Sequence, residues 1–580
     1  MNICGVDLGF NFTGFQLIYT IVACIMWICS LLFSKEYMAH YENKKRYYIF
    51  MVATWIATVG VLASTNFLTT FIFFEIMSFT SYLLVIHEET PGPMKAGETY
   101  LAVAVIGGMV MLMGLFLLHD ALGTLKFAEL TAAKEAYLLA GGSSKRLFAA
   151  GLCILFGFGA KAGMVPLHIW LPKAHPIAPA PASALLSGIL TKSGIFGAIV
   201  VSVCLFFENQ TWGVMMASIG MVTMFLGALL GVFSIDLKRT LACSSVSQIG
   251  FITLGIGMIV LLGEENALAS NGTILHMINH SMIKLLLFSA AGVVYMNLHK
   301  LNLNDIRGYG KNKPALLVLF AIGAASISGV PGTSGYISKT LLHESIVEYI
   351  EHAAHLGHAG LSNLFSVYEW VFLVTGGLTF CYMLKLFICI FIEDNKDWAL
   401  REKYKNKYCM NNLSLGCLIV PAAILTIMGL TPYLTMNGIA AGAREFLHGF
   451  EAEHAVHYFT WVNLKGSIIS LSIGAVLYLG LVRIFFMDDG VYKNLWPAKV
   501  DLEELVYRPL IALLLKPGIF KYIDGIIDNF RFMEWYHSHH GRHFKKFHEA
   551  YLYARDSMSF GLFLAAFGLA VLLVFMLISL

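Results

Sequence analysis

Long apolar runs dominate this chain of 580 residues and separate it from soluble proteins. A membrane-crossing helix needs about 20 consecutive apolar residues, and about fourteen such runs can be distinguished. They are expected near residues 11–33, 47–66, 68–86, 98–119, 147–171, 178–206, 211–234, 241–263, 273–296, 314–343, 368–393, 413–431, 466–487 and 557–579. Charged residues make up only 13% of the chain, about half of the ~25% usual in globular domains. The sequence therefore predicts an all-α polytopic membrane protein.

The basic residues of the loops predict an orientation. Cytoplasmic loops of membrane proteins carry an excess of Lys and Arg. Alternate loops here are rich in these residues, at 35–46, 95, 173, 238–239, 300–313 and 396–407. The intervening loops are poorer, apart from one long loop at 126–146. We therefore expect the basic loops in the cytoplasm and both termini outside. The net charge of +3 is close to neutral and gives no reason to expect a nucleic-acid partner.

Two inverted repeats of five helices are predicted, at 47–206 and 207–393. In each repeat the fourth helix is interrupted, at Pro166 in the first and at Pro331 in the second. Paired broken helices at matching places are typical of transport sites near the membrane midplane, although Gly and Pro are also common in membrane helices generally. The remaining predicted segments are an N-terminal span and loop (1–46), additional spans (394–499), a lateral amphipathic helix (500–556) and an anchor span (557–580).

Ionisable residues recur inside the predicted spans, where a charge costs at least ~2.5–3.5 kcal/mol. They are Glu75, Lys161, Lys192, His276, His280, Lys284, Lys339 and Lys385. A Glu75–Lys161 pair across neighbouring helices would lower the cost of both charges and couple their protonation. A buried lysine next to a movable carboxylate or proton is a usable proton carrier. Such a row on successive spans predicts a proton path.

Some of these residues have other interpretations. His276, His280 and Lys284 recur every four residues and share one helix face. Paired histidines also suit zinc, but no third ligand accompanies them in the helix, so a proton relay fits better. Lys385 and Lys284 are alternatively interfacial lysines that extend toward the headgroups.

No cofactor is expected in this chain. Its ten cysteines are scattered and form no C-x-x-C pair or ferredoxin-type run, which gives no indication of a zinc site or an iron–sulfur cluster. The sequence also lacks a phosphate-binding Walker motif and a dinucleotide fingerprint. Redox chemistry that drives this protein would therefore take place in another subunit.

Five stretches together carry a family resemblance: FFEIMSFTSYLL, GAKAGMVPLHIWLPKAHPIAPAPASALLSGILTKSG, SIDLKRTLACSSVSQIG, HMINHSMIKLLLF and GVPGTSGYISK. The chain resembles the antiporter-like subunits shared by respiratory complex I, group 4 membrane-bound [NiFe] hydrogenases and Mrp cation/proton antiporters, and looks closest to the hydrogenase-type members. Family members normally have two further helices before the segment where this chain starts, so we expect either that the chain is naturally shorter or that a partner supplies those helices.

The resemblance implies roles for individual residues. Glu75 and Lys161 match the glutamate–lysine pair of the first half-channel, and Lys192 matches the basic position that connects it onward. Lys238, His276 and His280 match the central axis, with Lys284 on the same helix face. Lys339 matches the terminal position from which the proton leaves. Without the resemblance, Lys238 reads as a cytoplasmic loop charge.

The C-terminal part resembles the lateral helix of the distal family member, followed by a final span. A histidine-rich strip follows the lateral helix, with His537, His539, His540, His543 and His548. A solvated strip at the lipid headgroups is favoured for it over metal binding.

We thus expect a proton-translocating subunit of a membrane-bound [NiFe]-hydrogenase complex in a bacterial or archaeal cytoplasmic membrane, with Na⁺ as the alternative ion. Iron–sulfur clusters and the NiFe centre are expected in soluble redox partners, beside other antiporter-like and small membrane subunits and lipid. The alternatives are a complex I subunit, a stand-alone Mrp-type antiporter subunit, and a structural clamp with a vestigial channel.

Overall fold

The computed structural model describes residues 2–3, 6–405, 408–451 and 456–496. The predicted lateral helix, the anchor span and the histidine-rich strip lie outside the described residues. Within them, 11 helices are long and apolar enough to cross a membrane. The chain is an all-α polytopic membrane protein, as its apolar runs predict.

The first half consists of α1 (Gly14–Tyr37), α2 (Lys44–Leu62), α3 (Phe67–Val85), α4 (Pro91–Leu122), α5 (Phe127–Leu139), α6 (Ser144–Ala162), η1 (Leu167–Trp170), α7 (Leu171–Ile177), α8 (Ala180–Leu185), η2 (Leu186–Leu190) and α9 (Thr191–Leu205). It begins with a short antiparallel pair, β1 (Asn2–Ile3) and β2 (Val6–Asp7). Helix α5 lies where the sequence predicts only a long loop, and its mixture of small and polar residues explains why no apolar run marks it.

The second half consists of α10 (Gln210–Phe233), α11 (Leu237–Leu262), η3 (Gly263–Glu265), α12 (Ala267–Leu298), α13 (Leu303–Ile306), α14 (Pro314–Ser328), α15 (Ser334–His355), α16 (Ala359–Phe387) and η4 (Ile388–Ile392). The additional elements are α17 (Trp398–Tyr404), α18 (Asn412–Leu430), α19 (Pro432–Ala443), η5 (Glu445–Leu447), α20 (Trp461–Leu477) and η6 (Tyr478–Phe485). The strands β3 (Met487–Asp488) and β4 (Val491–Tyr492) then form a hairpin that pairs Met487 with Tyr492.

Two of the predicted spans differ from single long apolar helices. The predicted run 47–66 corresponds to α2, which opens with three basic residues and is not among the 11 apolar helices. The predicted run 314–343 is divided into α14 and α15 by the residues between Ser328 and Ser334. The two-repeat division itself stays a prediction.

Both predicted breaks interrupt helical geometry. Helix α6 ends at Ala162, and Gly163 follows with φ +80°. The positive φ favours glycine at this position, and a Cβ atom there would also have to displace the end of the Leu171 side chain, whose Cδ1 would lie 2.1 Å away. Helix α14 ends in the same way at Gly329, with φ +75°. In each case a lysine, Lys161 or Lys339, lies within about three turns of the break.

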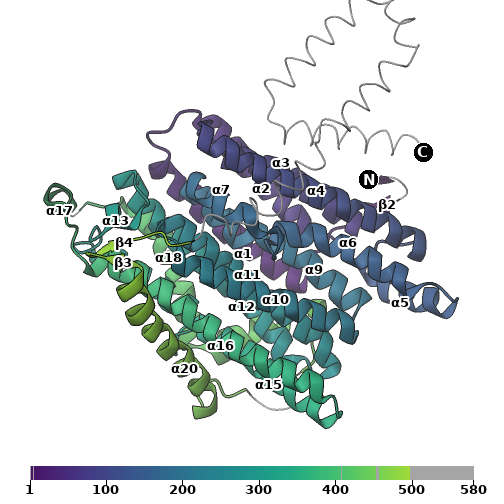
Figure 1. The fold of residues 1–580 in the computed structure, drawn as a ribbon. Helices are drawn as coiled ribbons and strands as arrows, with labels where there is room; N and C mark the ends of the chain where they lie inside the picture. Colours follow the sequence, from purple (N-terminus) through teal and green to yellow (C-terminus); the bar gives the residue numbers. More distant parts are fainter. Residues whose placement is uncertain (1, 4–5, 406–407, 452–455, 497–580) are drawn as a thin grey trace, which may run out of the picture. The chain divides into compact units, whose positions relative to one another are not determined.

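The most deeply buried helices run through the centre. The spans α8–α9 and α11 are almost wholly buried, whereas only 17% of the apolar window of α20 and η6 is buried. Helices α10, α11 and α12 lie side by side (Figure 1), and α12 also contacts α1, α8, α14 and α15. Polar side chains on α11 and α12 are therefore enclosed by protein.

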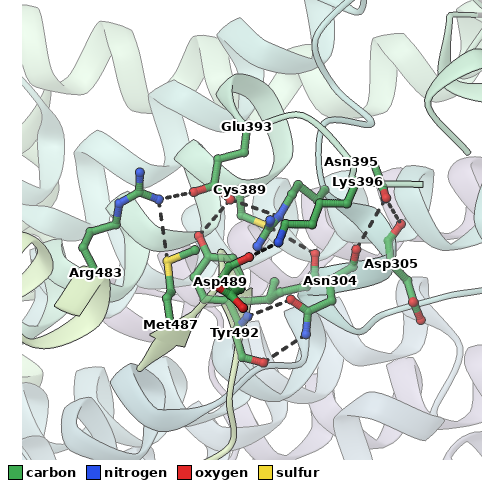
Figure 2. A network of polar contacts seen from close by, with 12 residues as sticks. Asn304, Asp305, Cys389, Glu393, Asn395, Lys396, Arg483, Met487, Asp489 and Tyr492 are labelled. Carbon is green, nitrogen blue, oxygen red and sulfur yellow. Dashed lines mark hydrogen bonds and ion pairs between the residues drawn. The ribbon is translucent and has the colours of Figure 1, made fainter. Parts of the chain in front are cut away.

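The β3–β4 hairpin is held by a polar network around Glu393, which follows η4 (Figure 2). The Glu393 carboxylate lies 3.2 Å from Arg307 Nε, accepts a hydrogen bond from Arg483, and accepts another from the Tyr492 hydroxyl at 3.1 Å. Asn304 binds the Tyr492 main chain twice, by accepting from its N–H at 2.8 Å and donating to its carbonyl at 3.0 Å. We call these five residues the Glu393 network.

Candidate functional site

Lys161, in the last turn of α6, is buried against α3 and α4. Its ammonium donates to Ser78 Oγ at 3.0 Å and to the Tyr100 hydroxyl at 2.6 Å, and lies 4.8 Å from the Tyr100 ring centre. The Tyr100 hydroxyl is also 2.6 Å from Ser81 Oγ. The charge is thus solvated by hydroxyls, which both donate and accept hydrogen bonds and suit proton transfer.

Glu75 lies on α3 with its carboxyl group against α4. The close approach is made at Gly108, where a Cβ atom would come within 2.3 Å of Glu75 Oε1. That oxygen is buried and has no hydrogen-bond partner among the described residues. Glu75 and Lys161 lie within Coulombic range of each other, but no ion pair within 4.0 Å joins them in the described part of the chain. The predicted pair is therefore near but not in direct contact.

Lys192 and His280 meet between α9 and α12. The Lys192 ammonium is in hydrogen-bond contact with His280 Nδ1 and donates to the Ser187 carbonyl at 3.0 Å. Ser187 lies in the π-helical turn η2, directly before α9. Such turns frequently mark functional sites because they disturb the regular helical hydrogen bonds. Lys192 is wholly buried, which places it well inside the protein.

Lys284 and Lys238 are also buried, and each is held by main-chain carbonyls. Lys284 donates to the Leu241 carbonyl at 2.8 Å and to Ser244 Oγ. Lys238 donates to the Ala178 carbonyl at 2.7 Å, from the first turn of α11. Neither lysine is an exposed loop or interfacial charge, since both are essentially inaccessible.

His276 connects the centre to the second break. Its Nδ1 is 3.0 Å from Ser338 Oγ and its Nε2 is 3.0 Å from Gln248 Oε1. Lys339, which follows Ser338 in the chain, donates to the Ile327 carbonyl of α14 at 2.8 Å. The imidazole therefore contacts a hydroxyl and an amide, and no group of three or more metal-binding side chains occurs among the described residues.

These contacts define the buried row: Lys161, Lys192, Lys238, His276, His280, Lys284 and Lys339, with Glu75 beside its first member. Among the described residues, none of its lysines has a carboxylate within 4.0 Å. Carbonyls, hydroxyls and imidazoles surround the cations instead. The row can accordingly change protonation without breaking an ion pair.

The structure adds His175 to this region, a residue that sequence reasoning did not assign. Its ring is wholly buried, and neither nitrogen has a hydrogen-bond partner among the described residues. It lies 6.3 Å from the Trp170 ring and within Coulombic range of Lys284 and Lys238. Trp170 in turn lies 4.9 Å from the ring of Tyr100. His175 is therefore situated between Lys161 and the centre of the row. The prolines that surround it in the sequence gave no indication that its side chain is buried.

Lys385 has a different environment from the row. Its ammonium donates to the carbonyls of Gly231, Val232 and Ser234 at 3.2, 2.7 and 2.6 Å. These carbonyls end α10, and a lysine that binds terminal carbonyls stabilises a helix end. This geometry favours the structural interpretation of Lys385.

The fold and the buried row define a polytopic helical membrane protein with broken helices and a line of buried ionisable groups. Residues 64–359, more than half of the chain, match the family described as NADH:quinone oxidoreductase/Mrp antiporter, TM. The chain belongs to this family of antiporter-like membrane subunits.

Individual relatives agree with this assignment. The chain is 32% identical to Hydrogenase-4 component B of Escherichia coli (strain K12), over 71% of this chain and 60% of that protein. It is 28% identical to Na(+)/H(+) antiporter subunit A1 of Staphylococcus haemolyticus (strain JCSC1435), over 82% and 59%. It thus spans about three fifths of the length of these relatives. A chain in the structure of the Mrp complex from Dietzia sp. DQ12-45-1b shares the fold, with a TM-score of 0.65 and 20% identity over 79% of this chain and 85% of that one.

Proposed function

We propose that this chain translocates protons along the buried row, as one subunit of a redox-driven membrane complex of the [NiFe]-hydrogenase type. The observation that carries the proposal is the row itself: five buried lysines are held by neutral groups, His280 contacts Lys192, and His276 lies between Gln248 and Ser338. A charge kept in the membrane without a counter-ion is expensive, and such residues mark ion pathways and proton relays.

The direction and the driving force belong to the same proposal. With the basic loops in the cytoplasm, the row would carry protons from that side toward Lys339 and the outside. Moving one charge against 100 mV takes ~2.3 kcal/mol, which electron transfer from ferredoxin or formate to protons at a partner hydrogenase would supply. The iron–sulfur clusters and the NiFe centre would lie in that partner. The similarity to the hydrogenase-4 component supports this version.

A cation/proton antiporter without a redox partner is the second candidate. It is supported by the similarity to the Na(+)/H(+) antiporter subunit, which extends over more of this chain. In that case a Na⁺ gradient would drive the proton, and the complex would respond to Na⁺ without any electron donor.

One experiment separates the candidates. The native complex is extracted in mild detergent, its chains are identified by mass spectrometry, and it is reconstituted into vesicles with a pH-sensitive dye inside. On the hydrogenase proposal, nickel- and cluster-binding subunits co-purify, and proton movement starts when reduced ferredoxin or formate is added. Proton movement on a Na⁺ gradient alone would contradict it and favour the antiporter. A complex that oxidises NADH and contains a quinone-site subunit would instead be of the complex I type. A complex that moves no ion would favour the remaining candidate, a structural clamp with a vestigial channel.

A further inference from the structure

A small cavity separates Lys339 from a polar cluster nearer the end of α15. The cavity has a volume of about 30 Å³ and is lined by Lys339, His343, Ser328, Asn463 and Ser467, among others. A polar cavity of ~10–15 Å³ or more is large enough for a water molecule. The space between Lys339 and His343 is therefore suited to a bridging water.

Lys339 and His343 are four residues apart and so lie on the same face of α15. Beyond the cavity, the His343 ring is held between two carboxylates. Its Nδ1 is 3.0 Å from Glu344 Oε1 and its Nε2 is 3.3 Å from Glu369 Oε1 of α16. An imidazole placed in this way has a carboxylate at each nitrogen to receive a proton.

Accessibility increases along the same line. Lys339 is 8% exposed, the side chain of His343 is 15% exposed, and those of Glu344 and Glu369 are 25% and 30% exposed. His343 and Glu344 lie midway along α15, beyond Lys339 in the direction of the α15–α16 loop. Helix α15 ends on the side of the fold away from the basic loop at 300–313 that carries α13 (Figure 1). The sequence predicts that the α15–α16 loop lies on the exterior side of the membrane.

From this geometry we infer that His343, together with Glu344 and Glu369, is the exit relay that accepts the proton released by Lys339. The inference deepens the proposed function and rests on it. One N–H bond of the Lys339 ammonium breaks and the proton passes through cavity water to form an imidazolium at His343. The imidazolium then loses one proton to Glu344 or Glu369, which releases it to water outside, so that His343 and the carboxylate return to their starting states.

The cavity has a wall that can be altered without touching the relay. A Cβ atom at Gly466 of α20 would lie 3.7 Å from His343 Cε1 and 3.8 Å from its Nδ1, which is ordinary contact. Gly466→Ala should therefore fit, whereas the longer side chain of Gly466→Leu should fill the water space. Because α20 is the least buried of the membrane-crossing helices that the structure describes, this pair of variants is a mild structural change.

The test uses the whole complex in vesicles, with the electron donor that drives the wild type, and measures protons moved per electron pair. His343→Ala should reduce this ratio about tenfold or more, in line with the loss of a proton-transfer group. Imidazole added on the exit side should restore part of it, and imidazole on the other side should not. His352→Gln, on the same helix but in an exposed pair with Glu265, should leave the ratio unchanged. Gly466→Leu should reduce the ratio and Gly466→Ala should not.

The outcomes distinguish the relay from the proposed function. Undiminished pumping by both His343→Ala and Gly466→Leu, in a complex that Lys339→Met inactivates, would overturn the relay and leave the path intact. If Lys339→Met also pumps normally, the proposed path itself is wrong. Should His343→Ala fail to assemble, the two Gly466 variants decide the matter, since equal ratios for both would contradict the relay.

Discussion

The buried row and the Glu393 network both gather ionisable side chains, but they use different residues and hold their charges in different ways. In the Glu393 network, two arginines face one carboxylate, and a tyrosine hydroxyl completes its shell. In the row, lysines face carbonyls, hydroxyls and imidazoles, and the carboxylates near Lys161 and Lys238 are not in direct contact with them. Paired charges fix one arrangement, whereas lysines held by neutral groups can gain and lose protons. Arginine also stays protonated in proteins, whereas lysine and histidine can release a proton, so residue type and environment together separate the proposed path from the scaffold.

The largest effect is expected from Lys192→Met, in the middle of the row. Methionine is unbranched and of similar length, so it can occupy the same space without the charge. We predict that proton movement falls to background while the complex assembles, because His280 loses its hydrogen-bond partner in the relay. Vesicle acidification per assembled complex measures this, and pumping at the wild-type rate would place Lys192 outside the path.

An intermediate effect, on stability and not on pumping, is expected from Arg307→Met. The change removes one cation from the largely buried Glu393 carboxylate, whose side chain is 12% exposed, and leaves Arg483 in place. Leaving a buried charged group partly unsatisfied should lower the free energy of unfolding by about 1–3 kcal/mol. Thermal unfolding in detergent should show the loss. Pumping per assembled complex should stay at the wild-type level, and a selective loss of pumping would erase the distinction between the two regions.

The smallest effect is expected from Asp394→Asn, which removes two exposed ion pairs, with Lys311 and with Arg401. Lys311 donates to Asp394 at 2.7 Å and lowers the pKa of that carboxyl group. Both side chains are well exposed, so the change in stability should stay within ~0.2–1 kcal/mol. Because the folded-state pKa is depressed, the pair's contribution is present above the ordinary value of ~3.9 and is lost as the pH falls through the lower, folded-state value. A difference between wild type and Asp394→Asn that grows above pH 5 would contradict this assignment.

The fold could be predicted largely from local properties of the sequence. Apolar length marks each span, and Pro166 and Pro331 mark the two breaks, so the helix ends at Gly163 and Gly329, two or three residues earlier, were within reach. Helix α5 was not, because it is short and lacks an apolar run. The predictions for 500–580 lie outside the described residues.

The site was predictable as a set of residues but not as a set of contacts. Tyr100 and Ser78 reach Lys161 from positions 61 and 83 residues away, and no periodicity links them. The sequence also does not distinguish Lys385 from Lys192, since both are lysines inside apolar runs. Only the end of α10, packed against α16, shows that Lys385 binds helix-terminal carbonyls.

The contrast between Lys385 and the lysines of the buried row can be measured directly, and it tests whether the row is the proton path. Lys161→Met and Lys385→Met each remove one wholly or almost wholly buried lysine, the first from the row and the second from a helix end. Protons moved per electron pair are compared for the two variants in vesicles with equal amounts of assembled complex. We predict a ratio near zero for Lys161→Met and near the wild-type value for Lys385→Met. Equal ratios in the two variants would contradict it.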